Sequence, residues 1–257
     1  MKICWFSTGI SSFIACYLSK NIDEIIYTHV PNQHPDSLRF LKDAERILNQ
    51  KITILQSEKY RDIDDVIERA RYINGVYGAA CTQRLKIDVR REWEKNHLGE
   101  MHTYVWGFDI DEKSRADRIV KRMPTVDHEF PLISHGLTKE DAHGMADRLG
   151  IRRPAMYELG YQNNNCIGCV KGGMWYWNKI RRDFPEVFQK RARQERMIGH
   201  SCIKGVFLDE LAPDRGRKED EIMQDCSILC QLAYIENKNR RNIDELYENK
   251  DGIENNK

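Results

Sequence analysis

The 257-residue sequence has no apolar run that approaches the roughly 20 residues needed by a membrane-spanning helix. It has no excess of either charge, because 41 Lys and Arg residues face 40 Asp and Glu residues and leave a formal net charge of +1. The first absence predicts no membrane partner, and the second offers no global field that favours nucleic acid. No signal peptide precedes the first apolar segment, so we expect a soluble, cytoplasmic protein.

Two common nucleotide-binding motifs are also absent. No glycine-rich loop ends in Gly-Lys-Ser or Gly-Lys-Thr, and the first turn lacks the G-x-G-x-x-G spacing of dinucleotide-binding folds. No internal repeat is present either. A nucleotide site in this chain would therefore have to be built in another way.

The first eighteen residues offer such a site. Lys2–Phe6 is an apolar segment typical of a buried strand, residues 7–12 are small, and residues 13–18 predict a helix. Unpaired N–H groups and the positive end of a helix dipole would point into this turn, so it could hold a phosphate. The alternative is an ordinary strand-to-helix turn capped by a serine.

Apolar and amphipathic segments alternate over residues 1–150. Strands are predicted at residues 2–6, 24–30, 52–55 and 103–108, and residues 126–132 are predicted to be a fifth strand or an extended segment. Helices are predicted at residues 13–18, 34–49, 63–72, 82–96, 112–123 and 138–149. This order predicts an α/β fold with a doubly wound, mostly parallel five-stranded sheet. Such sheets bind ligands at the carboxyl ends of their strands, where the first turn lies.

The pattern changes near Ile151. We divide the chain into a nucleotide-binding domain at residues 1–150, a helical, cysteine-bearing region at 151–235 that packs on it, and a polar tail at 236–257. One long helix is predicted over residues 174–198, with a bend at Pro185. The tail is too polar to bury much surface and is expected to fray.

Cysteines are the first candidate ligands. The chain has eight, which we expect to be reduced because the cytosol disfavours disulfides. Cys4 and Cys16 lie in apolar segments and are interpreted as ordinary buried residues. The C-x-x-C spacing and a pair one helical turn apart suit thiolate ligands of one metal or cluster. Five cysteines are candidates for that site: Cys81, Cys166, Cys169, Cys226 and Cys230. Reduced core cysteines are the alternative.

Three further groups could carry chemistry. Lys86 and Arg90 share a helix face and could reach a phosphate, although a solvated basic face is the commoner meaning. Residues 107–118 place acids and Arg115 after a strand, which suits a nucleotide or Mg²⁺, or simple helix capping. Residues 171–182 combine tryptophan, tyrosine, lysine and arginine, and either stack on nucleic acid or pack as an amphipathic helix.

Together these segments resemble the phosphoadenosine-phosphosulfate (PAPS) reductase family, within the PP-loop or adenine nucleotide alpha hydrolase-like superfamily. Within that family, the likeness is closest to uncharacterised proteins of phages and bacteria. Six motifs in order carry the resemblance over residues 2–234: WFSTGISSFIA, HPDSLRFLKDAE, CTQRLKIDVRREW, GFDIDEKSRADR, NNNCIGCVKGGMWYWNKIRRDFPEVF and DCSILC. The resemblance implies a five-stranded parallel sheet that binds an adenine nucleotide over the first strand and its loop.

The resemblance also implies roles for individual residues. It implies phosphate binding by Ser7, Thr8, Gly9, Ser11 and Ser12, and an adenine near Thr28, His29 and Val30. It implies that Lys86 and Arg115 act at the phosphate or sulfate end, as catalytic residues. It implies that Cys81, Cys166 and Cys169 hold a [4Fe–4S] cluster.

Two departures from the family pattern bear on the reaction. The family loop reads Ser-Gly-Gly-x-Asp-Ser, whereas this chain has Thr8 in place of the first glycine and Ser11 in place of the aspartate that helps manage Mg²⁺. The family's C-terminal Glu-Cys-Gly-x-His motif is not found in residues 236–257. The first departure argues against ATP cleavage, and the second argues against PAPS reduction through that cysteine.

Three functions therefore stay open. The first is a PAPS-reductase-like enzyme that uses ATP or a PAPS- or APS-type nucleotide to transfer sulfur or adenylate an acceptor, with a [4Fe–4S] cluster. The second is a phosphoadenylyl-sulfate reductase that produces sulfite. The third is a non-catalytic nucleotide-binding module with structural zinc. Expected partners are an adenine nucleotide, a nucleic-acid acceptor and a sulfur-donor protein or thioredoxin-like reductant, and a homo-oligomer stays open.

Overall fold

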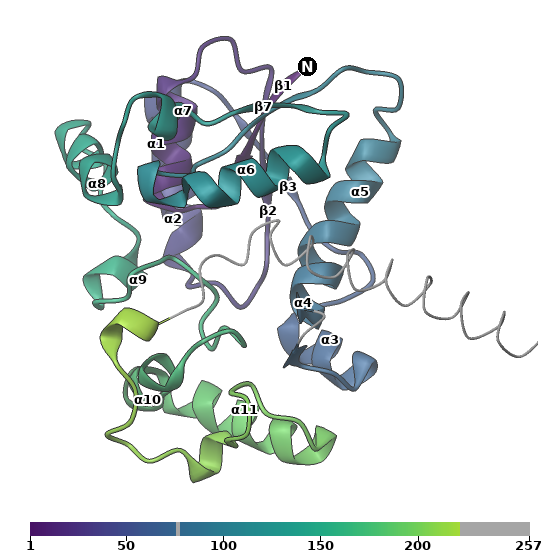
Figure 1. The fold of residues 1–257 in the computed structure, drawn as a ribbon, viewed down its shortest axis with the longest axis vertical. Coiled ribbons are helices and arrows are strands. Elements are labelled where there is room, and N and C mark those ends of the chain that lie inside the picture. The colour runs from purple at the N-terminus through teal and green to yellow at the C-terminus, as the bar shows by residue number, and fades with distance from the viewer. Residues whose placement is uncertain (76–77, 222–257) are drawn as a thin grey trace, which may run out of the picture.

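The computed structural model describes residues 1–75 and 78–221 of the chain (Figure 1). Its centre is a sheet of five parallel strands in the order β3-β2-β1-β6-β7. These strands are β1 (Lys2–Phe6), β2 (Glu24–Thr28), β3 (Ile52–Leu55), β6 (Thr103–Val105) and β7 (Asp127–Glu129). Two short strands, β4 (Asn74–Gly75) and β5 (Gly78–Ala79), form a separate antiparallel pair. The prediction of an α/β fold with a parallel five-stranded sheet is confirmed.

Helices pack on both faces of this sheet. On one face, α1 (Ile10–Leu18), α2 (Asp36–Leu48) and α8 (Lys139–Arg148) share a core with β1 and β2. On the other face, α5 (Asp88–Lys95) and α6 (Lys113–Arg122) pack on Ile3, Ile26 and Tyr104. Side chains alternate across each strand, which is why neighbouring residues of one strand contribute to different cores.

A third core brings together residues that are far apart in the sequence, from Val30 to Leu211. It contains Val30 after β2, residues of α3 (Ile63–Ala70) and residues from Met156 onward. The helices α10 (Met174–Asp183) and α11 (Pro185–Ile198) lie together at one end of the molecule, beyond the carboxyl ends of the strands (Figure 1). The remaining elements are α4 (Ala80–Thr82), the π-helix η1 (Gln83–Ile87), α7 (Pro131–Ser134), α9 (Ala155–Glu158) and the 3-10 turns η2 (Ile110–Glu112), η3 (Leu208–Glu210) and η4 (Lys218–Asp220).

Most element boundaries agree with the sequence pattern, and two differ because of a proline. The single helix expected over residues 174–198 is two helices, because Pro185 cannot continue α10 and instead starts α11. The last strand covers only Asp127–Glu129, since Pro131 opens a helical turn. The predicted capping box of α8 is present, with the Thr138 side chain accepting from Asp141 N–H at 3.1 Å.

The expectation that all cysteines are reduced is wrong for one pair. Cys4 of β1 and Cys16 of α1 form a disulfide, with Cα atoms 6.2 Å apart. The strand–turn–helix unit folds back on itself and brings the two residues together in one core, which their spacing in the sequence does not reveal. The predictions for Cys226, Cys230 and the tail at 236–257 lie outside the described residues. Within the described part of the chain, no helix is long and apolar enough to cross a bilayer.

Candidate functional site

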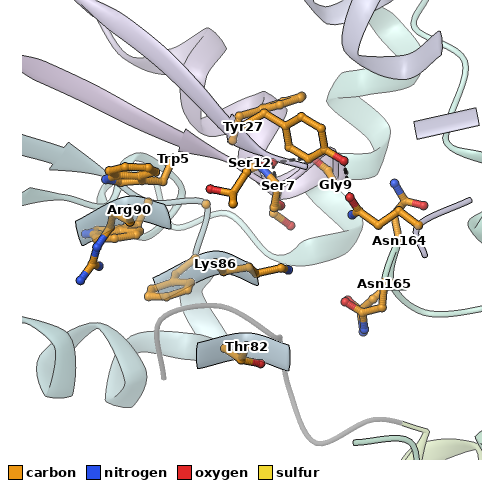
Figure 2. A pocket seen from close by; sticks show the side chains of 18 of the residues that line it. Trp5, Ser7, Gly9, Ser12, Tyr27, Thr82, Lys86, Arg90, Asn164 and Asn165 are labelled. Carbon is orange, nitrogen blue, oxygen red and sulfur yellow. Dashed lines mark hydrogen bonds between the residues drawn. The ribbon is translucent and has the colours of Figure 1, made fainter. Parts of the chain in front are cut away.

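The turn after β1 ends in the N-terminus of α1. Gly9 precedes the helix in an extended conformation, and no side chain among the described residues caps its first N–H groups. Ser12 instead holds the turn from inside: its Oγ accepts from Ser7 N–H at 3.1 Å and donates to Gly9 O at 2.9 Å. The first N–H groups of α1 thus have no capping side chain among the described residues and can bind an anion at the positive end of the helix dipole. Figure 2 shows Ser7, Gly9 and Ser12 at this turn.

The residue with an unusual backbone conformation in this turn is Thr8 and not Gly9. Its φ is 59°, in the left-handed region that a β-branched residue rarely adopts. Its side chain is fully buried and donates to Ser7 O at 2.6 Å. Asn164 Nδ2 donates to Thr8 O at 2.9 Å and Gln33 Nε2 approaches Thr8 Oγ1 at 3.4 Å. These bonds hold the strained residue in place, so Thr8 forms the back of the turn.

A buried chain of side chains continues behind Thr8. Tyr27 donates its phenol proton to Gln33 Oε1, and its oxygen also lies 3.1 Å from His29 Nδ1. Burial raises the pKa of Tyr27 and lowers that of His29, so both stay neutral at pH 7.

The end of β6 passes close to the same turn. A Cβ atom on Gly107 would lie 2.6 Å from both the N and Cα atoms of Ser12. The strand order reverses between β1 and β6, so the Ser7–Ser12 turn and Gly107 meet at the topological switch point of the sheet. Ligands of doubly wound sheets bind in the crevice at this point.

A cavity of about 150 Å³ opens there. It holds six of the predicted residues: Ser7, Gly9, Ser11, Ser12, Thr28 and Lys86. It is also lined by residues that the sequence did not single out as ligands: Trp5, Phe6, Tyr27, Gln33, Thr82, Trp106, Phe108, Tyr157, Asn163, Asn164 and Asn165. Arg90, Gly107 and these residues complete the lining. Thr8 lies behind the cavity, and His29 and Val30 are not among the lining residues.

Thr82, Lys86 and Arg90 form the wall opposite the strands. They are spaced four apart along the continuous helical segment α4–η1–α5, so they share one face. The predicted shared face of Lys86 and Arg90 is therefore present. Arg90 is buried, which lowers its pKa, and its Nε lies 3.1 Å from Glu94 Oε1.

Arg115 is placed differently from Lys86. It does not line the cavity but is buried on α6, where it forms an ion pair with Glu112. Its guanidinium lies 4.7 Å from the centre of the Phe108 ring, whose other surroundings include the cavity. Asp109, the acid nearest the cavity in sequence, caps the following turn by accepting from Asp111 N–H at 3.1 Å. Capping thus accounts for this acid without Mg²⁺.

Three of the predicted thiols lie together. Cys81, Cys166 and Cys169 line a second, smaller cavity of about 10 Å³ with apolar neighbours such as Val30 and Ile63. Cys202 belongs to the same core, but it lies beside Glu195, which accepts its N–H, and burial raises its thiol pKa. Although these three cysteines line one cavity, no group of three or more His, Cys, Asp or Glu side chains among the described residues is arranged so that it could hold a metal ion. Cys226 and Cys230, the remaining predicted ligands, fall outside the described residues.

The two cavities share a wall. Thr82 and Lys86 line both the cavity at the Ser7–Ser12 turn and the cavity of the three thiols. A ligand on the turn and a group on the thiols would therefore be neighbours across the same lysine.

The aromatic and basic helix α10 is mainly a packing element. Tyr176 and Trp177 are fully buried, so they cannot stack on nucleic acid. The Tyr176 phenol accepts from Cys169 N–H at 2.9 Å and donates to Cys166 O at 3.0 Å, and so supports the C-x-x-C loop. Arg181 donates to Leu208 O and Leu211 O.

Neither a protein-family model nor a curated protein matches this chain.

Proposed function

We propose that this protein is a PAPS-reductase-like enzyme that binds an adenine nucleotide, ATP or a sulfonucleotide, and uses it to transfer sulfur or adenylate an acceptor. The observation that carries the proposal is the Ser7–Ser12 turn at the switch point of the sheet, facing Lys86 across a cavity. The resemblance to PP-loop proteins supplies the nucleotide as ligand, and the uncapped N-terminus of α1 supports a phosphate there.

Each side of the cavity has a task in this reaction. The N–H groups of α1 would bind the phosphates, and Lys86 would neutralise negative charge from the opposite wall. In the ATP version, an acceptor oxygen attacks the α-phosphorus and pyrophosphate leaves with the electrons of the broken P–O bond. A sulfur nucleophile then attacks the adenylated carbon and displaces AMP. Preorganised N–H groups stabilise the charge that develops on phosphate in the first step.

A [4Fe–4S] cluster is the second part of the proposal. The soft thiols of Cys81, Cys166 and Cys169 share an apolar cavity, a donor set that suits an iron–sulfur group. Cys226 or Cys230 would supply a fourth thiolate. When bound, the cluster would supply sulfur or electrons, and Lys86 would separate it from the nucleotide.

Nucleotide binding is tested by calorimetric titration of the wild type and Ser12→Ala with ATP and with inorganic tripolyphosphate. The variant loses the bonds that hold Ser7 and Gly9, so we expect both ligands to bind about tenfold more weakly. Ser114→Ala, at an exposed serine of α6, is the matched control and should bind like the wild type. Absence of tripolyphosphate binding by the wild type would refute the anion site.

The reaction is tested on protein purified without air. Iron and acid-labile sulfide near four of each per chain, together with pyrophosphate release from ATP, would support the proposal. Sulfite release from PAPS would show a sulfonucleotide reductase instead. If the protein contains zinc without iron after anaerobic reconstitution and shows no turnover, it is a nucleotide-binding module without catalytic activity.

A further inference from the structure

The helix α1 lacks a side chain at the position from which a helix is usually capped. The side chain of the residue before a helix commonly accepts from the first N–H groups of that helix. In α1 this residue is Gly9, with φ of −101° and ψ of 159°. This backbone is extended and suits any residue, so the conformation does not require glycine. What glycine does provide is an open place in front of the first N–H groups.

Two hydroxyl groups border this open place. A Cβ atom on Gly9 would lie 3.4 Å from Ser7 Oγ and 3.4 Å from Tyr157 Oη. All three residues line the cavity, so the place of the missing side chain belongs to the cavity. Ser7 donates its hydroxyl proton to Ser12 Oγ at 3.0 Å and is thereby part of the turn itself. Tyr157 reaches the turn from a different part of the chain.

Packing sets the position of the Tyr157 phenol. Its helix, α9, is joined to α2 by Asp36 Oδ2, which accepts from Ala155 N–H at 2.8 Å. Arg39 of α2 also donates to two carbonyl oxygens just before α9, at 2.7 and 2.8 Å. The Tyr157 ring stands edge-on to His143 of α8, with ring centroids 4.8 Å apart and planes 81° apart. A hydroxyl held in this way needs little reorganisation to meet a ligand.

We propose that a tetrahedral oxyanion on the turn, a phosphate or a sulfate group, takes the place of the missing Gly9 side chain, and that Tyr157 binds it by donating its phenol proton. The N–H groups of α1 donate to the same anion, and hydrogen bonds to a charged acceptor are the strong ones. This inference rests on the proposed function, because it adds a ligand to the same anion site. It also means that residues 1–150 do not form the whole site.

The first test removes only the hydroxyl. Tyr157→Phe keeps the ring against His143, and calorimetry gives its Kd values and those of the wild type for inorganic tripolyphosphate, phosphate and sulfate. Each anion that the wild type binds should bind the variant at least about tenfold more weakly, because a hydrogen bond to a charged group is lost. Which anions bind the wild type separates a phosphate site from a sulfate site. Tyr17→Phe, at an exposed tyrosine of α1 outside the cavity, is the control and should bind like the wild type.

A second variant tests the place of the anion and leaves Tyr157 intact. In Gly9→Ala a methyl group fills the space between the two hydroxyls, while the extended backbone and the 3.4 Å contacts let the fold persist. We expect an unfolding midpoint in urea no lower than that of the wild type, and anion binding at least about tenfold weaker. Gly144→Ala makes the same change on α8 outside the cavity and should bind like the wild type.

Fluorotyrosine in place of Tyr157 keeps the hydroxyl and reports its contact directly. Its fluorine NMR signal should shift when tripolyphosphate is added. The same addition should leave the signal unchanged in a protein that also carries Gly9→Ala. This measurement decides the matter if Tyr157→Phe does not fold.

The outcomes separate this inference from the proposed function. A wild type that binds none of the three anions would overturn the anion site of the proposed function. Binding by the wild type with equal Kd values for a folded Tyr157→Phe would overturn the role of Tyr157 and leave the anion site standing. Binding by Gly9→Ala as tight as by the wild type would show that the anion does not take the place of the missing side chain.

Discussion

Gly107 shows how one missing side chain shapes the site. A methyl group at this position would meet backbone atoms of Ser11 and Ser12 at 2.6–2.8 Å, and backbone cannot move aside as a flexible side chain can. We expect Gly107→Ala to lower the free energy of unfolding by about 1–3 kcal/mol and to weaken tripolyphosphate binding, because the first turn of α1 must shift.

The control for this prediction is Gly144→Ala. Gly144 lies inside α8, where an added Cβ would meet only the end of the Arg148 side chain at 3.5 Å. Alanine is the better helix former, so this variant should be more stable by up to about 1 kcal/mol. Denaturant unfolding measures both, and a Gly107→Ala protein as stable and as active in binding as the wild type would contradict the close approach.

His143 makes the stability of the fold depend on pH. Burial and the nearby charge of Arg153 lower its pKa in the folded protein from 6.5 to about 4. The unfolded chain therefore binds a proton at higher pH than the folded chain does. The contribution of neutral His143 to stability is complete above about pH 6.5 and is lost as the pH falls from there towards 4.

Thermal unfolding of the wild type and His143→Gln between pH 7 and pH 4.5 tests this. Other groups titrate in both proteins, so the difference between the two curves isolates His143. We expect the Tm of the wild type to fall more than that of the variant. Parallel curves would mean that His143 is protonated equally well in both states.

At the residue scale, the sequence predicted the residues of the Ser7–Ser12 turn better than the buried side chains that hold the turn in place. Ser7 and Ser12 were singled out because small residues between an apolar strand and a helix indicate a turn, and Lys86 because it lies on a predicted helix with a basic face; all three line the cavity. Gln33 and Asn164 were missed because they reach Thr8 across 25 and 156 residues of chain, and Tyr27 was missed because it acts through Gln33; no local pattern marks such contacts. The sequence placed Arg115 on a helix but could not predict the direction of its side chain, since its burial against Phe108 depends on how α6 packs.

At the scale of elements, β1, the turn and α1 behave as one closed unit. The disulfide between Cys4 and Cys16 joins the strand to the helix across a separation of 12 residues and encloses the whole anion turn. Loop closure of this length restricts the unfolded chain and is worth about 3 kcal/mol. We expect reductant to lower the free energy of unfolding of the wild type by about that amount.

Cys16→Ser is the control and should show no change with reductant. Alkylation under denaturing conditions provides an independent check, because Cys4 and Cys16 should resist modification until the protein is reduced. Modification of both before reduction would show that the two thiols are not joined.

Elements were predicted well where one pattern dominates. Apolar runs predicted β1, β2, β3 and β6, the segment 126–132 expected to be a strand or extended contains β7, and the Thr138 box marked the start of α8. Boundaries were wrong where a single residue decides them: Pro185 divides one expected helix into two, and Pro131 ends the last strand early. The π-helix η1 (Gln83–Ile87) was not predicted, because the periodicity of apolar residues does not distinguish a π-helix from an α-helix.

At the scale of the molecule, Tyr176 connects the helical region to the thiols. Tyr176→Phe leaves Cys169 N–H and Cys166 O without their bonds in a fully buried place. We expect a loss of about 1–3 kcal/mol in the free energy of unfolding and a lower iron content after reconstitution. Tyr17→Phe, at an exposed tyrosine of α1, should be within about 0.5 kcal/mol of the wild type.

Unfolding in urea and iron analysis measure the two effects. If the variant is as stable as the wild type but contains less iron, the Tyr176 phenol acts only in the incorporation of iron. If neither the stability nor the iron content changes, the C-x-x-C loop does not depend on the phenol. The core that contains Tyr176 includes residues on both sides of Ile151, so the sequence boundary placed there is not a boundary of packing.

The strand order has a consequence for synthesis on the ribosome. β1 is the central strand and is translated first, but one of its two neighbours, β6, pairs with it from about 100 residues later. At ~5–20 residues per second, the nascent chain carries one unpaired edge of its most apolar strand for roughly 5–20 s. Expression of this protein should therefore depend on chaperones that bind short apolar segments during translation, although β1 is covered in the folded protein.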